Sequence, residues 1–332
     1  MAQTEFSIKS AADWLRQNDN FLIITHEHPD GDALGSIFGM LSMLRKNGKT
    51  ADAFLPEPLP EKYLDFAPCD FRSELSRIEL NSYNYCISLD NPKTTRAGMG
   101  ANLAFNDIVL PVLNIDHHPD NSQFGKWNLV MPKAAATAEI IYSIFKEIPE
   151  WQISPTTASL LMLGIVTDTG GFRFDNTSPD VLRKAAELLE LNADYHKIVL
   201  NMFFSNPLIQ QEFEAELMMH HLRLKCNGRF AWFFIPNELL KKYSIDMRNT
   251  EGLIEALRVI KGTEIVAIMQ PREEGFKISL RSKNPKYSVG AIARQLNGGG
   301  HELAAGGLIK TTSRESAEKI LLAHVEKVLN EI

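Results

Sequence analysis

The chain has 332 residues, of which 44% are hydrophobic and 23% charged, and its net charge is −6. This balance excludes disordered and fibrous proteins, and the length suggests two domains. The longest strongly apolar stretch, near Ala158–Val166, is far shorter than the ~20 residues that cross a bilayer, and Met1–Asn20 carries no export signal. Because Cys69, Cys86 and Cys226 are too few and too scattered for a disulfide framework, we expect a cytoplasmic protein.

Charge is distributed unevenly along the chain. Residues 1–220 contain 17 Lys and Arg against 29 Asp and Glu, a net charge of −12, whereas residues 221–332 contain 18 against 12, a net charge of +6. An acidic half can hold cations, and a basic half can hold an anionic substrate. Surface charge that simply varies between domains would give the same counts. The charge distribution alone therefore does not identify a function, and the sequence motifs are needed to distinguish the two interpretations.

Strand and helix patterns alternate through residues 1–195. Apolar runs predict strands at Phe21–Thr25, Ala51–Leu55, Tyr83–Leu89 and Ile108–Ile115. Helical spacing of apolar residues predicts helices at Ser7–Gln17, Ala33–Lys46, Thr137–Lys146, Thr156–Ile165 and Pro179–Leu191. This alternation favours an α/β fold with a doubly wound, mostly parallel sheet over residues 1–195.

The second half of the chain has a different pattern of predicted elements. From Asn206 to Leu224 the chain is polar and helix-prone, and we assign residues 196–224 to a helical connector. Residues 225–332 are expected to form a second, smaller α/β domain. Its predicted elements are strands at Arg229–Ile235, Glu264–Gln270 and Gly275–Leu280, a glycine-rich segment at Asn297–Gly307 and a closing helix at Ser313–Leu329.

Four clusters of acidic and histidine residues are expected at strand ends. The first, HEHPDGD at residues 26–32, directly follows the apolar run Phe21–Thr25. Ligands of open α/β sheets bind beyond the carboxyl ends of the strands, so His26, Asp30 and Asp32 can converge there on a metal ion. A polar turn in which Asp32 caps the following helix would have the same sequence, so both interpretations stay open here.

The other three clusters follow later apolar segments. Asp90 comes directly after Tyr83–Leu89, and DHHP at residues 116–119 follows the next predicted strand. Adjacent histidines point in different directions, so one can bind metal while the other faces a substrate, and Asp116 can orient a ring. Asp168 ends the fourth apolar segment, before two glycines.

Together the clusters offer six metal ligands. They are His26, Asp30, Asp32, Asp90, His117 and Asp168. Six ligands exceed the need of one catalytic ion but suit two ions that share a carboxylate. Imidazole and carboxylate ligands without cysteine disfavour structural zinc and fit Mn²⁺, Mg²⁺ or Fe²⁺. Two cations ~3.5–4 Å apart stabilise both the entering and the leaving oxygen of phosphoryl transfer.

These motifs carry a family resemblance. HEHPDGDALGS at residues 26–36 and DHHP at 116–119 resemble the DHH phosphoesterase superfamily, and GGGHELAAG at 298–306 resembles its DHHA1 domain. The motifs occur in the family's order and span nearly the whole chain. TDTGGFRF at 167–174 is most similar to the stand-alone NrnA-type oligoribonucleases and 3′-phosphoadenosine 5′-phosphate phosphatases. The resemblance implies a metal-dependent phosphoesterase with two divalent ions, Mn²⁺ before Mg²⁺ or Fe²⁺.

The resemblance also implies a role for each residue of the N-terminal clusters. His26 and Asp30 would hold one ion, and Asp90 would bridge to the second. The second ion would be held by Asp32, His117 and Asp168. His118 would be catalytic, because it would face the scissile phosphate. Two departures from the usual pattern, His28 before the proline and Asn91 after Asp90, bear on substrate preference.

The C-terminal domain is expected to bind the substrate. Gly298, Gly299 and Gly300 lack side chains, so their backbone N–H groups can approach a phosphate, and His301 adds a donor. A glycine triplet is also typical of a flexible turn. Its place in a domain of charge +6 favours an anion site, to which Arg281 can add a bidentate contact. The resemblance assigns the substrate's phosphate or nucleotide to Arg281 and His301 in particular.

The resemblance implies short oligoribonucleotides and nucleoside bisphosphates as substrates, with no membrane or long duplex partner, and it leaves a homodimer open. A soluble phosphodiesterase for cyclic or linear dinucleotides is the first alternative. A non-catalytic nucleotide-binding module is the second, and it would be expected to lack some of the six ligands, all of which are present.

Overall fold

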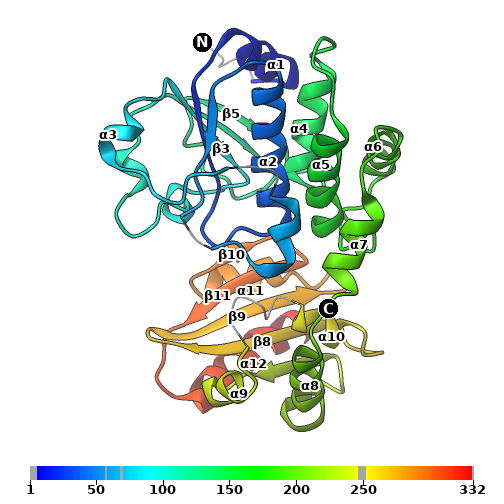
Figure 1. Ribbon diagram of the computed structural model, residues 1–332. Coiled ribbons are helices and arrows are strands. Elements are labelled where there is room, and N and C mark those ends of the chain that lie inside the picture. Colours follow the sequence, from blue (N-terminus) through cyan, green and yellow to red (C-terminus); the bar gives the residue numbers. More distant parts are fainter. Residues whose placement is uncertain (1–5, 57, 68–69, 246–251, 331–332) are drawn as a thin grey trace. The chain divides into compact units, whose positions relative to one another are not determined.

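The computed structural model describes residues 6–56, 58–67, 70–245 and 252–330. The chain forms two compact units, Met1–Ser205 and Asn206–Ile332, each with its own sheet (Figure 1). The division falls inside the segment 196–224 that was predicted as a connector. That segment is no separate element, because α7 (Tyr195–Phe203) belongs to the first unit and α8 (Leu208–Glu216) to the second.

The first unit contains a five-stranded, entirely parallel sheet, which confirms the predicted α/β fold class. In the order β2-β1-β3-β4-β5, its strands are Ala51–Ala53, Phe21–Ile24, Tyr85–Leu89, Val112–Asp116 and Trp127–Val130. The edge strand β5 was not predicted, because only Leu129 of its four residues is buried. The strand predicted from Ile108 begins later, at Val112, after a short 3₁₀ turn.

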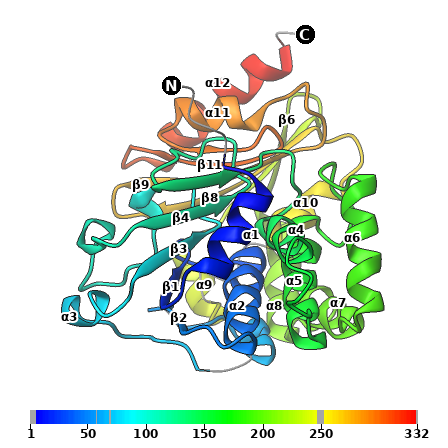
Figure 2. The same cartoon turned by 90° about the horizontal axis from the view of Figure 1, so that it is seen from above.

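Long helices gather on one face of this sheet (Figure 2). They are α1 (Ile8–Gln17), α2 (Gly31–Lys46), α4 (Thr137–Lys146), α5 (Pro155–Asp168) and α6 (Pro179–Glu190). Serines cap three of them, since the side chains of Ser7, Ser154 and Ser178 each accept a backbone N–H three residues on. The other face is covered by irregular segments, by the short α3 (Arg77–Leu80) and by the 3₁₀ turn η3 (Phe105–Asp107). A further 3₁₀ turn, η2 (Thr94–Arg96), directly precedes Ala97, which packs on this face. The 3₁₀ turn η1 (Glu61–Phe66) instead packs against the core under the long helices through Tyr63 and Phe66.

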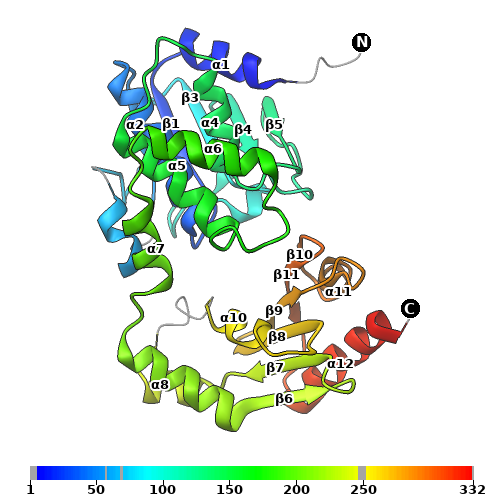
Figure 3. The same ribbon diagram turned by 90° about the vertical axis from the view of Figure 1, so that its right-hand side faces the viewer.

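The second unit contains a mixed six-stranded sheet with a core on each face. In the order β10-β11-β9-β8-β7-β6, its strands are Gly299–Gly300, Ala304–Ile309, Gly275–Ser282, Ile265–Arg272, Phe230–Phe234 and Leu222–Lys225. Helices α11 (Val289–Gln295) and α12 (Arg314–Asn330) cover one face (Figure 3). The other core is formed with α8, the π-turn η4 (Leu217–His221), α9 (Asn237–Lys242) and α10 (Leu253–Arg258).

No helix within the described ranges combines the length and the apolar character that crossing a bilayer requires.

Candidate metal centre

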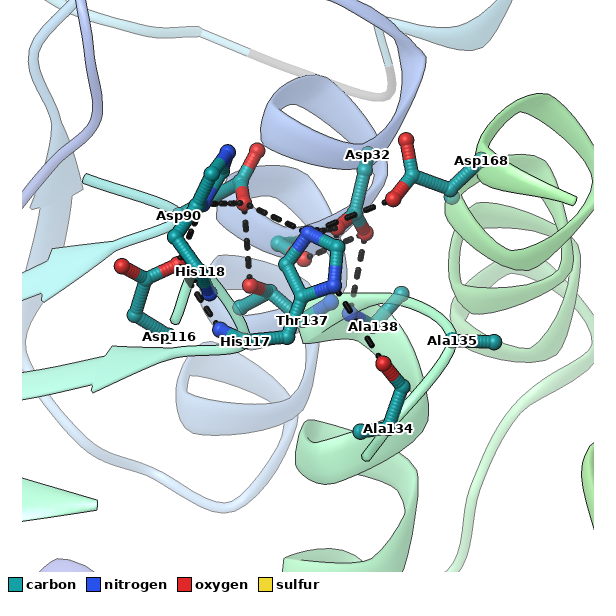
Figure 4. A network of polar contacts seen from close by, with 12 residues as sticks. Asp32, Asp90, Asp116, His117, His118, Ala134, Ala135, Thr137, Ala138 and Asp168 are labelled. Atoms are coloured by element: carbon teal, nitrogen blue, oxygen red, sulfur yellow. Dashed lines mark hydrogen bonds and ion pairs between the residues drawn. The ribbon is translucent and has the colours of Figure 1, made fainter. Parts of the chain in front are cut away.

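The strand order of the first unit changes direction between β1 and β3. The chain leaves β1 for β2 on one side, while β3 pairs with β1 on the other, which is where open α/β sheets bind ligands. Ile24 of β1 lies beside Ser88 of β3, and Leu89 lies beside Ile115 of β4. The polar residues that follow these strands therefore end up next to one another (Figure 4).

Asp90 lies at the centre of this cluster and is almost fully buried. Its φ of +54° turns the chain sharply after β3, a conformation that non-glycine residues adopt rarely. Its Oδ2 lies 3.5 Å from His26 Nε2, whereas its Oδ1 lies 3.6 Å from His117 Nε2. The hydroxyl of Thr137 donates to the same Oδ1 at 3.1 Å. The two carboxylate oxygens of Asp90 thus face different histidines.

One potential ligand group lies on the His26 side of Asp90. Ligand atoms of His26, Asp30 and Asp90 all lie within 4.8 Å of one another. The Nδ1–H of His26 donates to the Glu27 carbonyl at 2.7 Å, so the lone pair of the neutral ring is on Nε2, toward Asp90. This orientation is typical of a metal-binding histidine.

Asp30, and not Asp32, caps the helix that follows the first motif. Its Oδ1 accepts the backbone N–H groups of Asp32 and Ala33, each at 3.0 Å, and α2 begins at Gly31 instead of Ala33. The alternative interpretation, in which Asp32 caps this helix, is therefore wrong, since the cap is Asp30. Since a carboxylate offers about four lone pairs, capping leaves Asp30 able to bind a cation as well.

A second ligand group lies on the His117 side, where ligand atoms of Asp32, His117 and Asp168 lie within 4.8 Å of one another. His117 Nε2 is 3.2 Å from Asp168 Oδ2 and 3.9 Å from Asp32 Oδ2, and its Nδ1–H donates to the Ala134 carbonyl at 3.3 Å (Figure 4). This ring therefore also turns Nε2 toward the carboxylates.

Asp32 caps a helix other than its own. Its carboxylate accepts the backbone N–H groups of Thr137 at 2.6 Å and of Ala138 at 2.9 Å. These are the first N–H groups of α4, whose own N-cap residue, Ala136, has no capping side chain. The two bonds hold Asp32 at the positive end of α4.

Asp168 does not follow a strand, in contrast to the expectation for the fourth cluster. It is the last residue of α5, which continues three residues beyond the predicted end at Ile165. Close packing of α2 on α5 brings it to the site, because a Cβ at Gly35 would lie 2.4 Å from the Leu160 carbonyl oxygen. Because Gly35 has no side chain, the backbones of α2 and α5 touch there, and this contact brings Asp32 on α2 close to Asp168 on α5.

The second histidine of the DHH motif has a different partner. His118 Nδ1–H donates to Asp116 Oδ1 at 2.8 Å and lies 3.5 Å from Asp90 Oδ1. The expectation that Asp116 orients a ring is confirmed, and the ring is that of His118.

The burial of so many charges shifts their pKa values. Burial raises the pKa of Asp32 to about 7, with a further contribution from the charge of Asp90. Burial also raises the pKa of Asp168, and the charge of Asp32 adds to it. Burial lowers the pKa of His26, but the hydrogen bond to Asp90 and the charge of Asp30 outweigh it and raise that pKa to about 9. The crowded negative charges thus keep protons on neighbouring carboxyl and imidazole groups of the metal-free site. A divalent cation can take the place of these protons.

Metal binding is therefore expected to release protons. At pH 7 a pKa of about 9 keeps His26 protonated in the metal-free protein, whereas ligation needs a neutral ring. Burial lowers the pKa of His117, but the charges of Asp90 and Asp32 outweigh it and raise that pKa as well. We expect at least one proton per chain to be released at pH 7 and the apparent Mn²⁺ affinity to rise with pH up to about 9. Calorimetric titration in two buffers of different ionisation enthalpy measures this number, and an affinity independent of pH would contradict it.

In the second unit, Arg281 lies on β9 and is half-buried. It shares one face of the strand with Lys277 and Ser279, whereas Ile278 and Leu280 point into the core under α11 and α12. The sheet therefore presents basic side chains on the face opposite these helices.

The glycine triplet forms a tight edge strand, because Gly299 and Gly300 pair with β11 as β10. A Cβ at Gly298 would lie 1.9 Å from the Gly306 carbonyl oxygen, and Gly300 has a φ of +125°. The Gly298 N–H donates to the Ala293 carbonyl at 2.9 Å, so the expectation that this amide is available to a phosphate is wrong. His301, half-buried, follows the strand.

Among the contacts to the motif carboxylates that sequence reasoning missed are those of Thr137 with Asp90 and of Asn121 with Asp116. Neither contact has a local signal in the sequence. Thr137 lies 47 residues from Asp90, and Asn121 lies in a loop without regular structure. A hydroxyl at the start of a predicted helix is too common to mark a site.

Comparisons with known proteins agree with this arrangement. The DHH family N-terminal domain matches residues 20–165, and the DHHA1 domain matches residues 228–331. A Thermus thermophilus protein named bifunctional oligoribonuclease and PAP phosphatase NrnA is 30% identical over 312 residues, which cover 92% of this chain and 89% of that protein. The protein of the same name from Bacillus subtilis is 28% identical, over 91% of this chain and 93% of its own length.

A solved structure shares the fold. The crystal structure of an exopolyphosphatase-related protein from Bacteroides fragilis superposes with a TM-score of 0.85 and 23% identity, over 96% of this chain and 95% of that one. Because the likeness to these proteins runs through both units, the chain belongs to the DHH family of phosphoesterases, and its second unit is a DHHA1 domain.

Proposed function

We propose that the protein is a two-metal phosphoesterase that hydrolyses short oligoribonucleotides and nucleoside bisphosphates such as 3′-phosphoadenosine 5′-phosphate. The observation that carries the proposal is the position of Asp90, whose two oxygens face two separate ligand groups. The names of the relatives from Thermus thermophilus and Bacillus subtilis, oligoribonuclease and PAP phosphatase, support the substrate class.

The donor set suits two divalent ions. His26 and Asp30 would hold one ion and Asp32, His117 and Asp168 the other, with Asp90 shared between them. Nitrogen and oxygen donors without sulfur favour Mn²⁺, with Mg²⁺ or Fe²⁺ as alternatives. When bound, such ions lower the pKa of a water molecule toward neutrality and neutralise charge on phosphoryl oxygens.

His118 would act on the phosphate directly. Burial lowers its pKa, but the bond to Asp116 and the charge of Asp90 outweigh this effect and raise the pKa to about 9. The ring is therefore cationic at neutral pH in the metal-free protein, and Asp116 holds it in one orientation. A fixed cationic donor stabilises the negative charge that grows on phosphoryl oxygens during hydrolysis.

The DHHA1 unit would bind the nucleotide. Arg281, on the basic face of the sheet, would contact a phosphate through its planar guanidinium, and Gly300 and His301 would add backbone and ring donors. The Gly299 N–H would instead face Gly306 in the ladder of β10 with β11. Gly298 would contribute by allowing the close approach of β10 to β11.

A substrate panel tests the proposal. RNA di- to pentamers, 3′-phosphoadenosine 5′-phosphate, pApA, cyclic di-AMP and pyrophosphate are incubated with the protein and Mn²⁺, with and without a chelator. We expect RNA oligomers and the bisphosphate to be hydrolysed fastest, and the chelator to stop hydrolysis. Faster turnover of cyclic di-AMP would instead favour a dinucleotide phosphodiesterase, and no turnover of any phosphoester would favour a binding module.

Arg281→Ala is expected to lower kcat/KM on RNA dimers by about 10- to 100-fold, the cost of a lost charge-assisted contact. Metal content should stay that of the wild type, because Arg281 belongs to the other unit from the ligands. Lys286→Ala removes the same charge from an exposed position in that unit and serves as the control. Equal kinetics for both variants would remove Arg281 from the site.

A further inference from the structure

A row of polar side chains crosses the sheet of the first unit below the DHH motif. Ser88, Asn114 and Asn128 are register partners on β3, β4 and β5. They lie on the face opposite the long helices, since Ile87 and Leu113 next to them belong to the core under those helices. Ser88 and Asn114 are fully buried. Buried amides in a sheet cost free energy unless they are hydrogen-bonded, so their bonds indicate what the row does.

Asn121, in the loop after the motif, connects this row to the active site. Its Oδ1 accepts from Asn114 Nδ2 at 3.0 Å and from the Gln123 backbone N–H at 2.6 Å. Because both of these partners are donors, the oxygen of the amide faces them and the NH₂ group faces the other way. That NH₂ group donates to Asp116 Oδ2 at 2.6 Å and to the Asn91 carbonyl at 3.3 Å.

At the other end of the row, Asn128 also fixes the orientation of the Asn114 amide. Asn128 Oδ1 accepts from Asn114 Nδ2 at 3.4 Å and from the Gly125 backbone N–H at 3.0 Å. Asn114 must therefore present its NH₂ group to both Asn121 and Asn128. The side-chain amides are thus connected by hydrogen bonds in which Asn114 donates to both neighbours and Asn121 donates to Asp116.

Asp116 connects Asn121 to His118 and so fixes the orientation of the His118 ring. Its Oδ2 is occupied by Asn121, and its Oδ1 accepts from His118 Nδ1 at 2.8 Å and from the backbone N–H of His117 at 2.8 Å. A carboxylate held at one oxygen alone could rotate and carry the ring with it. The bond from Asn121 to the second oxygen removes that freedom, because Asn121 is itself fixed on both sides of its amide.

We infer that Asn121 is a positioning residue for hydrolysis, which orients the His118 ring through Asp116 and is itself oriented by Asn114. The inference rests on the proposed function, in which His118 contacts the phosphate. On this view the polar row below the motif holds the His118 side chain in one rotamer.

The test is Asn121→Asp, which keeps the size of the side chain but turns a carboxylate oxygen toward Asp116 in place of the NH₂ donor. We expect kcat on an RNA dimer to fall by about 10- to 100-fold, as for other residues that orient the groups at a metal site. KM and Mn²⁺ content should stay within about twofold. Asn84→Asp makes the same charge change at an exposed position and should leave kcat unchanged.

A double-mutant cycle separates positioning from a general structural role. In a His118→Ala background, Asn121→Asp should change kcat by less than about threefold, because the ring through which Asn121 acts is gone. The same cycle with Asn121→Ala, which removes the donor without adding a charge, covers the case that the aspartate variant does not fold.

An equal loss of kcat in both backgrounds, or a wild-type kcat for both Asn121 variants, would overturn the inference. A wild-type protein that hydrolyses no short RNA would instead refute the proposed function.

Discussion

Asp90→Asn is expected to lower kcat on short RNA by about 10³-fold or more, at the upper end of what one electrostatic contact contributes to catalysis. The substitution keeps the shape of the side chain but removes the charge that faces His26 at 3.5 Å and His117 at 3.6 Å. Those histidines, with His118, also hold the pKa of Asp90 below its usual range despite its burial. The carboxylate is therefore ionised and available to cations at neutral pH.

Steady-state kinetics and metal analysis of the same sample check this prediction. We expect the Asp90 variant to lose at least one equivalent of bound metal per chain. Asp65→Asn changes an exposed carboxylate of the same unit and should behave like the wild type. If Asp90→Asn retains more than a few per cent of the wild-type kcat, Asp90 does not have the shared role.

Gly35→Ala is expected to destabilise the first unit, although alanine is ordinarily the better helix former. A Cβ at Gly35 would lie 2.4 Å from the Leu160 carbonyl oxygen and 2.8 Å from the Gly164 backbone nitrogen, and backbone atoms cannot move aside as a side chain can. Forced separation of packed elements costs about 1–3 kcal/mol. At about 2–4 °C per kcal/mol for a unit of this size, that corresponds to a fall in Tm of roughly 2–12 °C.

Gly39→Ala, one turn further along α2, is the matched control. A Cβ there would meet side-chain atoms and no backbone, the nearest being Leu161 Cδ2 at 2.9 Å, and a side chain can adopt another rotamer. We expect this variant to be as stable as the wild type or slightly more stable, because glycine costs a helix about 0.5–1 kcal/mol. Thermal unfolding with and without Mn²⁺ compares the two, and equal stability would show that the contact of α2 with α5 is not close. Gly35→Ala should also weaken Mn²⁺ binding, since it moves Asp32 away from Asp168.

The elements that carry the first three clusters could be predicted from the sequence, for a physical reason. Strands buried on both faces are continuous apolar runs, as at Phe21–Ile24, and the helix at Thr137–Lys146 has one apolar face. The carboxyl ends of parallel strands lie at one edge of a sheet, so the prediction of a mostly parallel sheet already placed residues 26, 90 and 117 at that edge.

What the sequence did not reveal depends on contacts between elements. Helix α5 is buried nearly all round from Leu160 to Val166, so its pattern has no polar face that marks its end at Asp168. Asp32 caps α4 across more than a hundred residues, a bond without a local signal. The chain from Asn128 to Asp116 depends on strand register, which a single sequence does not specify.

The glycine triplet shows a related limit. Its sequence is compatible with a flexible turn, an anion-binding loop or closely packed strands. Only the pairing of β10 with β11 distinguishes them, because it shows Gly298 without room for a side chain and its amide bound to Ala293.

Anomalous diffraction from crystals of the Mn²⁺-loaded protein tests most directly whether two ions share Asp90. We predict two manganese peaks ~3.5–4 Å apart. One should contact His26 and Asp30, the other Asp32, His117 and Asp168, and Asp90 should bind both. A single peak, or two peaks of which Asp90 contacts only one, would contradict the shared site.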